Sequence, residues 1–318
     1  MCDRSTNTCV PSARLPDGAT VGDGGPIDAG PVDAGPVDAG PPAEPPSVPT
    51  DCWRPAGACD WSAPDAFTFE PDDGSTLGAL SIVNNVGYSP DGCELFFDSS
   101  GGELHVARRA AHGAPFEDRG VVDGVEMPGT RETSASITPD GLQIFYATDR
   151  DGDFVTVESA TRPDRDSPWT MPTRQPGLSF AGVNNWDGLL APHGLRFYWS
   201  PERPGGQDLY VAARASLDEP FEVGLLVEEL AGPGSQAEAG ATADGRVLTF
   251  VSDAPELGGR QMVYATRASW LDAFGPIREI PGAFLAAGEE AETTVSADGC
   301  EILIGRSRAV HRLLYQPR

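Results

Sequence analysis

Polar side chains recur at one equivalent position in five related segments of the chain. They stand six residues before a short turn in each segment: Asn85, Ser134, Asp187, Glu238 and Glu292. Two residues earlier, on the same face of an extended strand, stand Val83, Glu132, Asn185, Gln236 and Glu290. Carboxylates held close together share an electrostatic field, which raises some of their pKa values. This set is suited to bind a cation, an amine or a sugar hydroxyl.

The turns that follow these residues define a repeat. The anchors are Ser89–Gly92, Thr138–Gly141, Ala191–Gly194, Thr242–Gly245 and Ser296–Gly299, and four of them contain Asp-Gly while the third contains His193-Gly194. Each Gly is followed by a short apolar-aromatic run, such as Leu95–Phe97, and then by a second run that ends on Arg. A strand-turn-strand unit repeated about every 50 residues is typical of a propeller, because one blade cannot bury its own faces.

The repeats predict an all-β, five-bladed β-propeller over residues 61–318, with turns at 91, 140, 193, 244 and 298. An aromatic residue stands seven or eight positions after each Arg and starts the predicted outermost strand: Phe116, Trp169, Phe221 and Phe274. The fifth repeat stops before this strand, whereas Trp61–Phe69 looks like an unattached copy of it. We therefore expect residues 61–70 to complete the last blade and close the ring.

Three smaller segments precede the predicted ring. Residues 1–15 form a small cysteine-containing segment, residues 16–50 a linker with tandem Pro-x-Asp-Ala-Gly repeats, and residues 51–60 a cysteine loop. The linker has too few apolar residues to offset its ordering entropy, so we expect a disordered, extended tether. Its expected role is to hold the ring away from a surface.

The six cysteines favour an exported protein. Cys2 and Cys9 have the same spacing as Cys52 and Cys59, which predicts two small disulfide loops. Cys93 and Cys300 follow Asp-Gly turns in repeats that are neighbours in a closed ring, so a ring-sealing bond between them is conceivable. Equivalent sites on adjacent blades usually lie too far apart for a disulfide, so we expect these two cysteines to be free thiols.

Two phrases carry a resemblance to a known family. Ser-Pro-Asp-Gly with Leu95–Phe97, and Pro204–Arg214, resemble the TolB-type, WD-like propeller repeat of bacterial cell-envelope proteins. The resemblance covers residues 61–318; the third repeat departs with His193, and the fourth and fifth lack the turn proline. It implies a binding platform in the periplasm or at the cell surface, although a propeller fold hosts many functions.

The formal net charge of −26 argues against nucleic acid as a partner, because its phosphates would be repelled. No apolar run is long enough for a membrane helix, and no signal peptide is present in the sequence. We expect an exported, tethered monomer that binds an envelope protein or glycan without catalysis and without a cofactor.

Two alternatives remain open at this stage. Five-bladed propellers include furanosidases that use three channel carboxylates, and Asp187, Glu238 and Glu292 could supply a base, an acid and an orienting group, with Trp186 stacking on a sugar. The alternating carboxylates Asp149, Asp151 and Asp153 fit the oxygen ligands that calcium prefers. An ordinary hairpin turn explains the same segment, because no Glu closes a calcium loop.

Overall fold

The computed structural model has two compact units, Met1–Pro42 and Ala43–Arg318. The residues it describes are 2–3, 8–9, 44–49, 51–52, 59, 61, 67–70, 80, 82–99, 103–284, 291–306 and 309–315. In the first unit, β1 (Cys2–Asp3) pairs with β2 (Thr8–Cys9) and sets Cys2 opposite Cys9. The Cys2–Cys9 disulfide stays a prediction, since these side chains lie outside the described residues. The predicted linker also lies outside them, apart from 44–49, which have no regular secondary structure.

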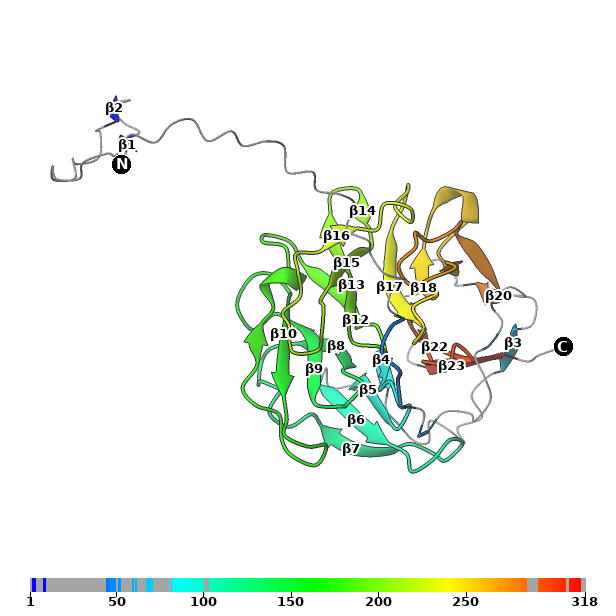
Figure 1. The fold of residues 1–318 in the computed structure, drawn as a ribbon. Helices are drawn as coiled ribbons and strands as arrows, with labels where there is room; N and C mark the ends of the chain where they lie inside the picture. The colour runs from blue at the N-terminus through cyan, green and yellow to red at the C-terminus, as the bar shows by residue number, and fades with distance from the viewer. Residues whose placement is uncertain are drawn as a thin grey trace, which may run out of the picture. The chain divides into compact units, whose positions relative to one another are not determined.

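The second unit is a five-bladed β-propeller (Figure 1), as predicted. In blades 1 to 3 the strands run outward from the centre in chain order. Blade 1 contains β4 (Ile82–Tyr88), β5 (Glu94–Ser99), β6 (Leu104–Arg108) and β7 (Glu117–Val121). Blade 2 contains β8 (Glu132–Ile137), β9 (Gln143–Thr148), β10 (Thr156–Thr161) and β11 (Thr173–Arg174). Blade 3 contains β12 (Asn185–Leu190), β13 (Arg196–Arg203), β15 (Tyr210–Ala213) and β16 (Leu225–Leu226), with β14 (Gly206–Gln207) paired to β13.

Blades 4 and 5 complete the ring. Blade 4 contains β17 (Gln236–Ala241), β18 (Val247–Ser252), β19 (Gln261–Thr266) and β20 (Arg278–Phe284). Blade 5 contains β21 (Ala291–Val295), β22 (Glu301–Arg306), β23 (Ala309–Tyr315) and, as its outer strand, β3 (Phe67–Glu70). The antiparallel pairing of β3 with β23 sets Phe69 opposite Leu313, which confirms the predicted closure by an N-terminal strand. Neighbouring inner strands contact one another all the way round, from β4 and β8 to β21 and β4.

The apolar-aromatic runs form the second strand of each blade and fill the core. Leu95, Phe96 and Phe97 are each at most 1% exposed, and so are Phe197, Tyr198 and Trp199. Consecutive residues of one strand point to opposite faces, so both faces of these strands are covered by neighbouring blades. This double burial explains why the runs are continuously apolar instead of alternating with polar residues.

Two disulfides join the segment before the ring to the turns of blades 1 and 5. Cys52 bonds to Cys93 and Cys59 bonds to Cys300, with Cα separations of 5.1 and 5.3 Å. The predicted Cys52–Cys59 loop is therefore wrong, and so is the prediction that Cys93 and Cys300 are free thiols. Disulfides persist in oxidising compartments, which indicates an extracytoplasmic protein. No helix among the described residues is long and apolar enough to span a membrane.

Cys52 and Cys59 bond to Cys93 and Cys300, and not to each other, because their segment lies against the turns of blades 1 and 5. The Cys52 amide donates to the Asp91 carbonyl (3.0 Å) and the Cys59 amide to the Asp298 carbonyl (3.2 Å). The Trp61 indole donates to the Gly299 carbonyl at 3.1 Å. Cys52, Cys59 and Trp61 thus belong to a strap across the turn ends of the first and last blades. Spacing along the chain carries no information about this placement.

An arginine clasps the turn in each of blades 1 to 4. In every case the guanidinium Nε donates to the turn glycine carbonyl and the group lies over an aromatic ring: Arg109 with Gly92 and Phe116, Arg162 with Gly141 and Trp169, Arg214 with Gly194 and Phe221, Arg267 with Gly245 and Phe274. The distances from guanidinium carbon to ring centre are 4.1–4.7 Å. Arginine suits this position because its planar group can stack and donate at once. The chain has 22 arginines and no lysine.

The turn aspartates stabilise their own turns: Oδ1 of Asp140 accepts from the Thr138 hydroxyl (2.6 Å) and the Leu142 amide (2.9 Å). In the third repeat, Nδ1 of His193 accepts from the Leu195 amide at 3.1 Å. His193 therefore takes over the role of the aspartate.

Candidate functional site

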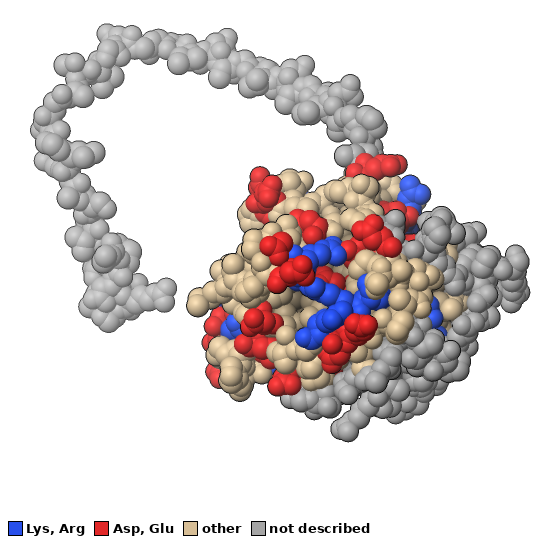
Figure 2. All heavy atoms as spheres, turned by 90° about the horizontal axis from the view of Figure 1, so that it is seen from below, with Lys and Arg blue, Asp and Glu red and all other residues tan. Residues whose placement is uncertain are grey.

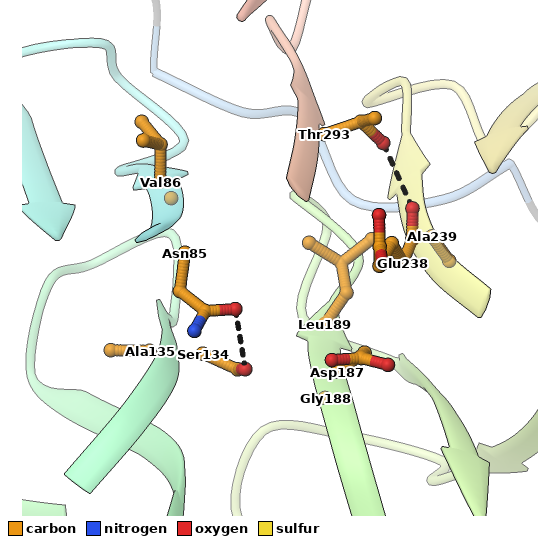
Figure 3. A pocket seen from close by; sticks show the side chains of 11 residues that line it. Asn85, Val86, Ser134, Ala135, Asp187, Gly188, Leu189, Glu238, Ala239 and Thr293 are labelled. Carbon is orange, nitrogen blue, oxygen red and sulfur yellow. Dashed lines mark hydrogen bonds between the residues drawn. The ribbon is translucent and has the colours of Figure 1, made fainter. Parts of the chain in front are cut away.

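The first predicted ring of polar residues converges on a cavity between the inner strands (Figure 3). Asn85, Ser134, Asp187 and Glu238 line it, together with small and apolar residues and Thr293. The backbone of Glu292 belongs to β21, but its side chain lies outside the described residues, as does Glu290 altogether. The cavity volume is about 30 Å³. That space holds a few waters or one small ion.

The four lining residues share an unusual backbone conformation. Their φ angles are 46° for Asn85, 52° for Ser134, 57° for Asp187 and 58° for Glu238, and no other described residue except glycine has a positive φ. Each lies where the pairing register of its inner strand shifts, which marks a β-bulge. A left-handed residue with a side chain costs about 1–2 kcal/mol, and such strain gathers at functional sites.

Close approach of the inner strands keeps the cavity narrow. A Cβ atom on Gly87 would lie 2.4 Å from the Ala135 carbonyl oxygen of the neighbouring inner strand, and one on Gly240 would lie 3.1 Å from the Val295 amide nitrogen. Side chains larger than glycine therefore do not fit at these two positions without movement. The narrow channel follows from these small residues in neighbouring inner strands.

A hydrogen-bond network links blades 1 and 2 beside the cavity. The Asn85 amide donates to Oδ2 of Asp98 (2.7 Å) and to the Thr133 hydroxyl, which itself donates to Asp98 Oδ2 at 2.6 Å. The Ser134 hydroxyl donates to Oδ1 of Asn85 at 3.0 Å. Burial raises the pKa of Asp98 to about 7, against the opposing effect of the Thr133 and Asn85 hydrogen bonds and the Arg131 charge. Asp98 was not predicted from the sequence, because it stands in the second strand, outside the aligned positions.

The carboxylates of the cavity differ in their surroundings. Glu238 is 6% exposed and forms an ion pair with Arg260. Its backbone carbonyl accepts from the Thr293 hydroxyl at 2.8 Å. Asp187 is half-buried, and the neighbouring Trp186 ring has the Arg131 guanidinium 5.6 Å from its centre. The structure thus brings Asp187 and Glu238 to one cavity, and an arginine occupies one face of Trp186.

The second predicted ring lies elsewhere. Glu132 is fully buried and bonds to Arg150 at 2.9 Å, within blade 2. Asn185 is also fully buried, where its amide donates to the carbonyls of Val155, Phe180 and Val183. Gln236 is 1% exposed and is not among the residues that line the cavity. The reason is the bulge: a left-handed residue interrupts the two-residue alternation, so positions two apart no longer share a face.

The calcium candidate has the geometry of a turn. Oδ1 of Asp149 accepts from the Arg131 amide at 2.8 Å, and its carbonyl accepts from the Gly152 amide at 3.2 Å. Asp151 and Asp153 are exposed. Within the described ranges, no group of three or more His, Cys, Asp or Glu side chains is arranged to hold a metal ion.

Neither a protein-family model nor the sequence of a curated protein matches this chain. Similar solved structures include the putative TolB from Agrobacterium tumefaciens, with 17% identity, a TM-score of 0.45, and coverage of 70% of this chain and 68% of that chain. TolB from Acinetobacter baumannii is 14% identical with a TM-score of 0.45 and coverage of 72%, and this chain spans 53% of its length. The endo-arabinase from Bacteroides thetaiotaomicron VPI-5482 is 13% identical with a TM-score of 0.54, covering 79% of this chain and 98% of that chain. At this identity the similarity is one of fold.

Proposed function

We propose that this chain is a non-catalytic binding propeller of the bacterial cell envelope, which recognises a protein or glycan partner. The observation that carries the proposal is the size of the channel cavity. At about 30 Å³ it is an order of magnitude smaller than the roughly 300–1,000 Å³ of typical small-molecule sites. A partner is therefore recognised at the loop surfaces around the ring, where equivalent blades differ in sequence.

Glycoside hydrolysis by Asp187, Glu238 and Glu292 is the competing function. Retaining and inverting enzymes need two carboxyl groups on either side of a bound sugar, roughly 5–10 Å apart. A cavity of this volume has no room for a sugar ring between Asp187 and Glu238. Glu238 is also engaged in an ion pair with Arg260.

The envelope location is supported by the two disulfides of the propeller and by the composition of the segment before it. The disulfides Cys52–Cys93 and Cys59–Cys300 are stable in a periplasm or at a cell surface. The tandem Pro-x-Asp-Ala-Gly repeats of residues 26–40 have the composition of a spacer. We propose that residues 16–50 tether the ring to a surface.

Hydrolysis and binding can be measured on the same preparation. The full chain is incubated with arabinan and xylan, and released reducing ends are counted for the parent and for the double variant Glu238→Gln with Glu292→Gln. We expect no release by either protein. In parallel, the immobilised chain is exposed to solubilised envelope material, and we expect reproducible enrichment of a protein or glycan that survives both substitutions. Hydrolysis by the parent that the double variant loses would overturn the binding function.

A further inference from the structure

A second, larger cavity lies on the loops of blades 2, 3 and 4. It is a groove of about 470 Å³, and its side chains with recognition chemistry are Phe154, Asn184, Glu202, Arg203, Gln207 and Ser235. None of these residues belongs to the aligned turns or to the channel. The volume falls within the range of small-molecule sites.

The polar side chains of the groove are held in place before any ligand arrives. The Arg203 guanidinium lies 4.4 Å from the ring centre of Tyr210 and 5.4 Å from that of Phe180. Oδ1 of Asn184 accepts from the Val155 amide (2.9 Å), and its amide group donates to Oε2 of Glu202 at 2.8 Å. Groups oriented in this way lose little conformational freedom on binding.

Gln207 and Ser235 extend this polar wall from two blades. The Gln207 side-chain amide donates to the Ser200 carbonyl at 3.2 Å, and the Gln207 backbone amide donates to the Ser235 hydroxyl at 3.3 Å. The contacts leave Oε1 of Gln207 and Oε1 of Glu202 without a hydrogen bond to any described residue. The groove thus presents planar acceptors beside a fixed guanidinium donor.

An aromatic ring completes the surface. Phe154 is 43% exposed although it is among the most apolar side chains of blade 2. An exposed aromatic face beside planar amide, carboxylate and guanidinium groups complements a sugar ring, which has an apolar C–H face and hydroxyls around its edge. Glu202 and Arg203 balance each other in charge, and the whole chain carries a net charge of −26, so an anionic sugar is disfavoured.

We infer that this groove binds a neutral oligosaccharide; the inference rests on the proposed binding function and names the class of ligand. A peptide fits less well. Peptides that add a strand need a row of unpaired backbone groups, whereas β14 has only two residues and is already paired with β13. Peptide binding is therefore one of the outcomes that would count against the inference.

Calorimetry on the full chain tests the groove. The probes are arabino-, xylo- and cello-oligosaccharides of about three to six units, with oligogalacturonate as the anionic comparison and an unstructured peptide pool as the second comparison. We expect the parent to bind at least one neutral series. Phe154→Ala should weaken that binding by about tenfold, while Phe154→Tyr should retain it. Glu202→Gln, which keeps the shape of the side chain, should weaken it as well.

Met171→Ala is the matched control, because Met171 is 88% exposed and lies outside the groove. It should leave saccharide binding unchanged, and thermal unfolding should show the same midpoint for all four variants. Binding of a neutral sugar that resists both Phe154→Ala and Glu202→Gln would overturn the inference, and so would binding of only oligogalacturonate or peptide. A partner enriched from envelope material equally by the parent and Phe154→Ala would leave the proposed function standing and would refute the groove. Absence of every ligand in both assays would refute both.

Discussion

The two ends of the blades differ in how much their residues vary from one blade to the next. At the turn end, four blades use the same arginine, turn glycine carbonyl and aromatic ring. Towards the other end, at one equivalent bulge, blades 1 to 4 carry Asn85, Ser134, Asp187 and Glu238, which differ in size and charge. Identical chemistry in four blades indicates a contribution to stability. Side chains that differ from blade to blade, although the backbone conformation is the same, indicate positions where a functional residue can be placed.

On the side of the ring shown in Figure 2, a central group of arginines is surrounded by Asp and Glu side chains. Several of the ion pairs join adjacent blades, such as Arg162 with Glu94 (3.0 Å) and Arg165 with Asp91. Some of the 48 acidic residues of the chain are therefore paired with arginines across the boundary between blades, and the net charge of −26 remains.

Removing the strap should produce the largest loss of stability. The Cys59–Cys300 bond joins residues separated by 241 positions, and a loop of this length stabilises the fold by about 5 kcal/mol in the chain-entropy model. The double variant Cys59→Ser with Cys300→Ser should lower the free energy of unfolding by about that amount in urea titrations. The reduced parent serves as the comparison. A loss below about 1 kcal/mol would mean that the strap contributes little to ring closure.

Breaking one clasp should have the next largest effect. Arg162 is 7% exposed, donates to Gly141 and Arg165 carbonyls, and pairs with Glu94. Arg162→Met leaves these buried groups without their donor and should cost roughly 3–4 kcal/mol. Arg119→Met is the control, because its ion pair with Glu117 is exposed and should contribute less than about 1 kcal/mol. Equal effects of the two substitutions would contradict the stabilising role of the clasp.

The third turn should make stability depend on pH. Burial, together with the Arg196 and Arg267 charges, lowers the pKa of His193 from 6.5 to about 4. Between these values the unfolded chain binds a proton that the folded chain does not, so stability falls as the pH falls from 6.5 to 4. The expected loss is about 3 kcal/mol at 1.36 kcal/mol per pKa unit.

His193→Asn tests this, because Asn can accept the same amide hydrogen bond and does not titrate. The stability difference between parent and variant should change by about 3 kcal/mol from pH 7.5 to pH 4. The raised pKa of Asp98 acts in the opposite direction, with stability falling as the pH rises from about 4 to 7, but it is common to both proteins and cancels in the difference. A difference that is constant with pH would show that His193 titrates in the folded chain with the same pKa as in the unfolded chain.

Relieving the bulge should have the smallest effect, and it should be a gain. Ser134→Gly removes a left-handed side-chain residue and should stabilise the fold by up to about 1 kcal/mol, less the contribution of the Ser134–Asn85 hydrogen bond. The thermal midpoint should rise, by at most about 2–4 °C. Ser136→Gly, outside the left-handed region, should instead lower it. A lower thermal midpoint for Ser134→Gly would mean that the left-handed conformation of Ser134 does not destabilise the fold.

Much of the fold could be predicted from residues that act locally. Asp-Gly fixes a tight turn wherever it occurs, and an apolar run after each turn predicts a doubly covered strand. The closing strand could be predicted because Trp61–Phe69 resembles the outer strands and the last repeat lacks one. These features depend on neighbouring residues in the chain, so one sequence is enough to recognise them.

The site was less predictable, because it depends on backbone deviations and on contacts between distant segments. The position of Ser134 in the repeat could be recognised from the sequence, but its left-handed φ could not. That backbone angle turns the Glu132 side chain away from the channel and towards Arg150. The partners of Cys52 and Cys59 depend on the strap lying across turns of two different blades. The groove around Phe154 combines loops of three blades and carries no repeated motif.

The strap also determines how the ring would respond to mechanical force. A pull applied through residues before Cys52 and after Cys300 passes along the backbone to Cys59 and then through the Cys59–Cys300 bond. The chain between residues 59 and 300 lies outside this covalent path, so four blades and the closing strand β3 carry no tension. Only the backbone after Cys300 can be drawn out, beginning with β23. A ring bridged in this way would keep its loop surfaces intact under loads that would peel apart an unbridged propeller.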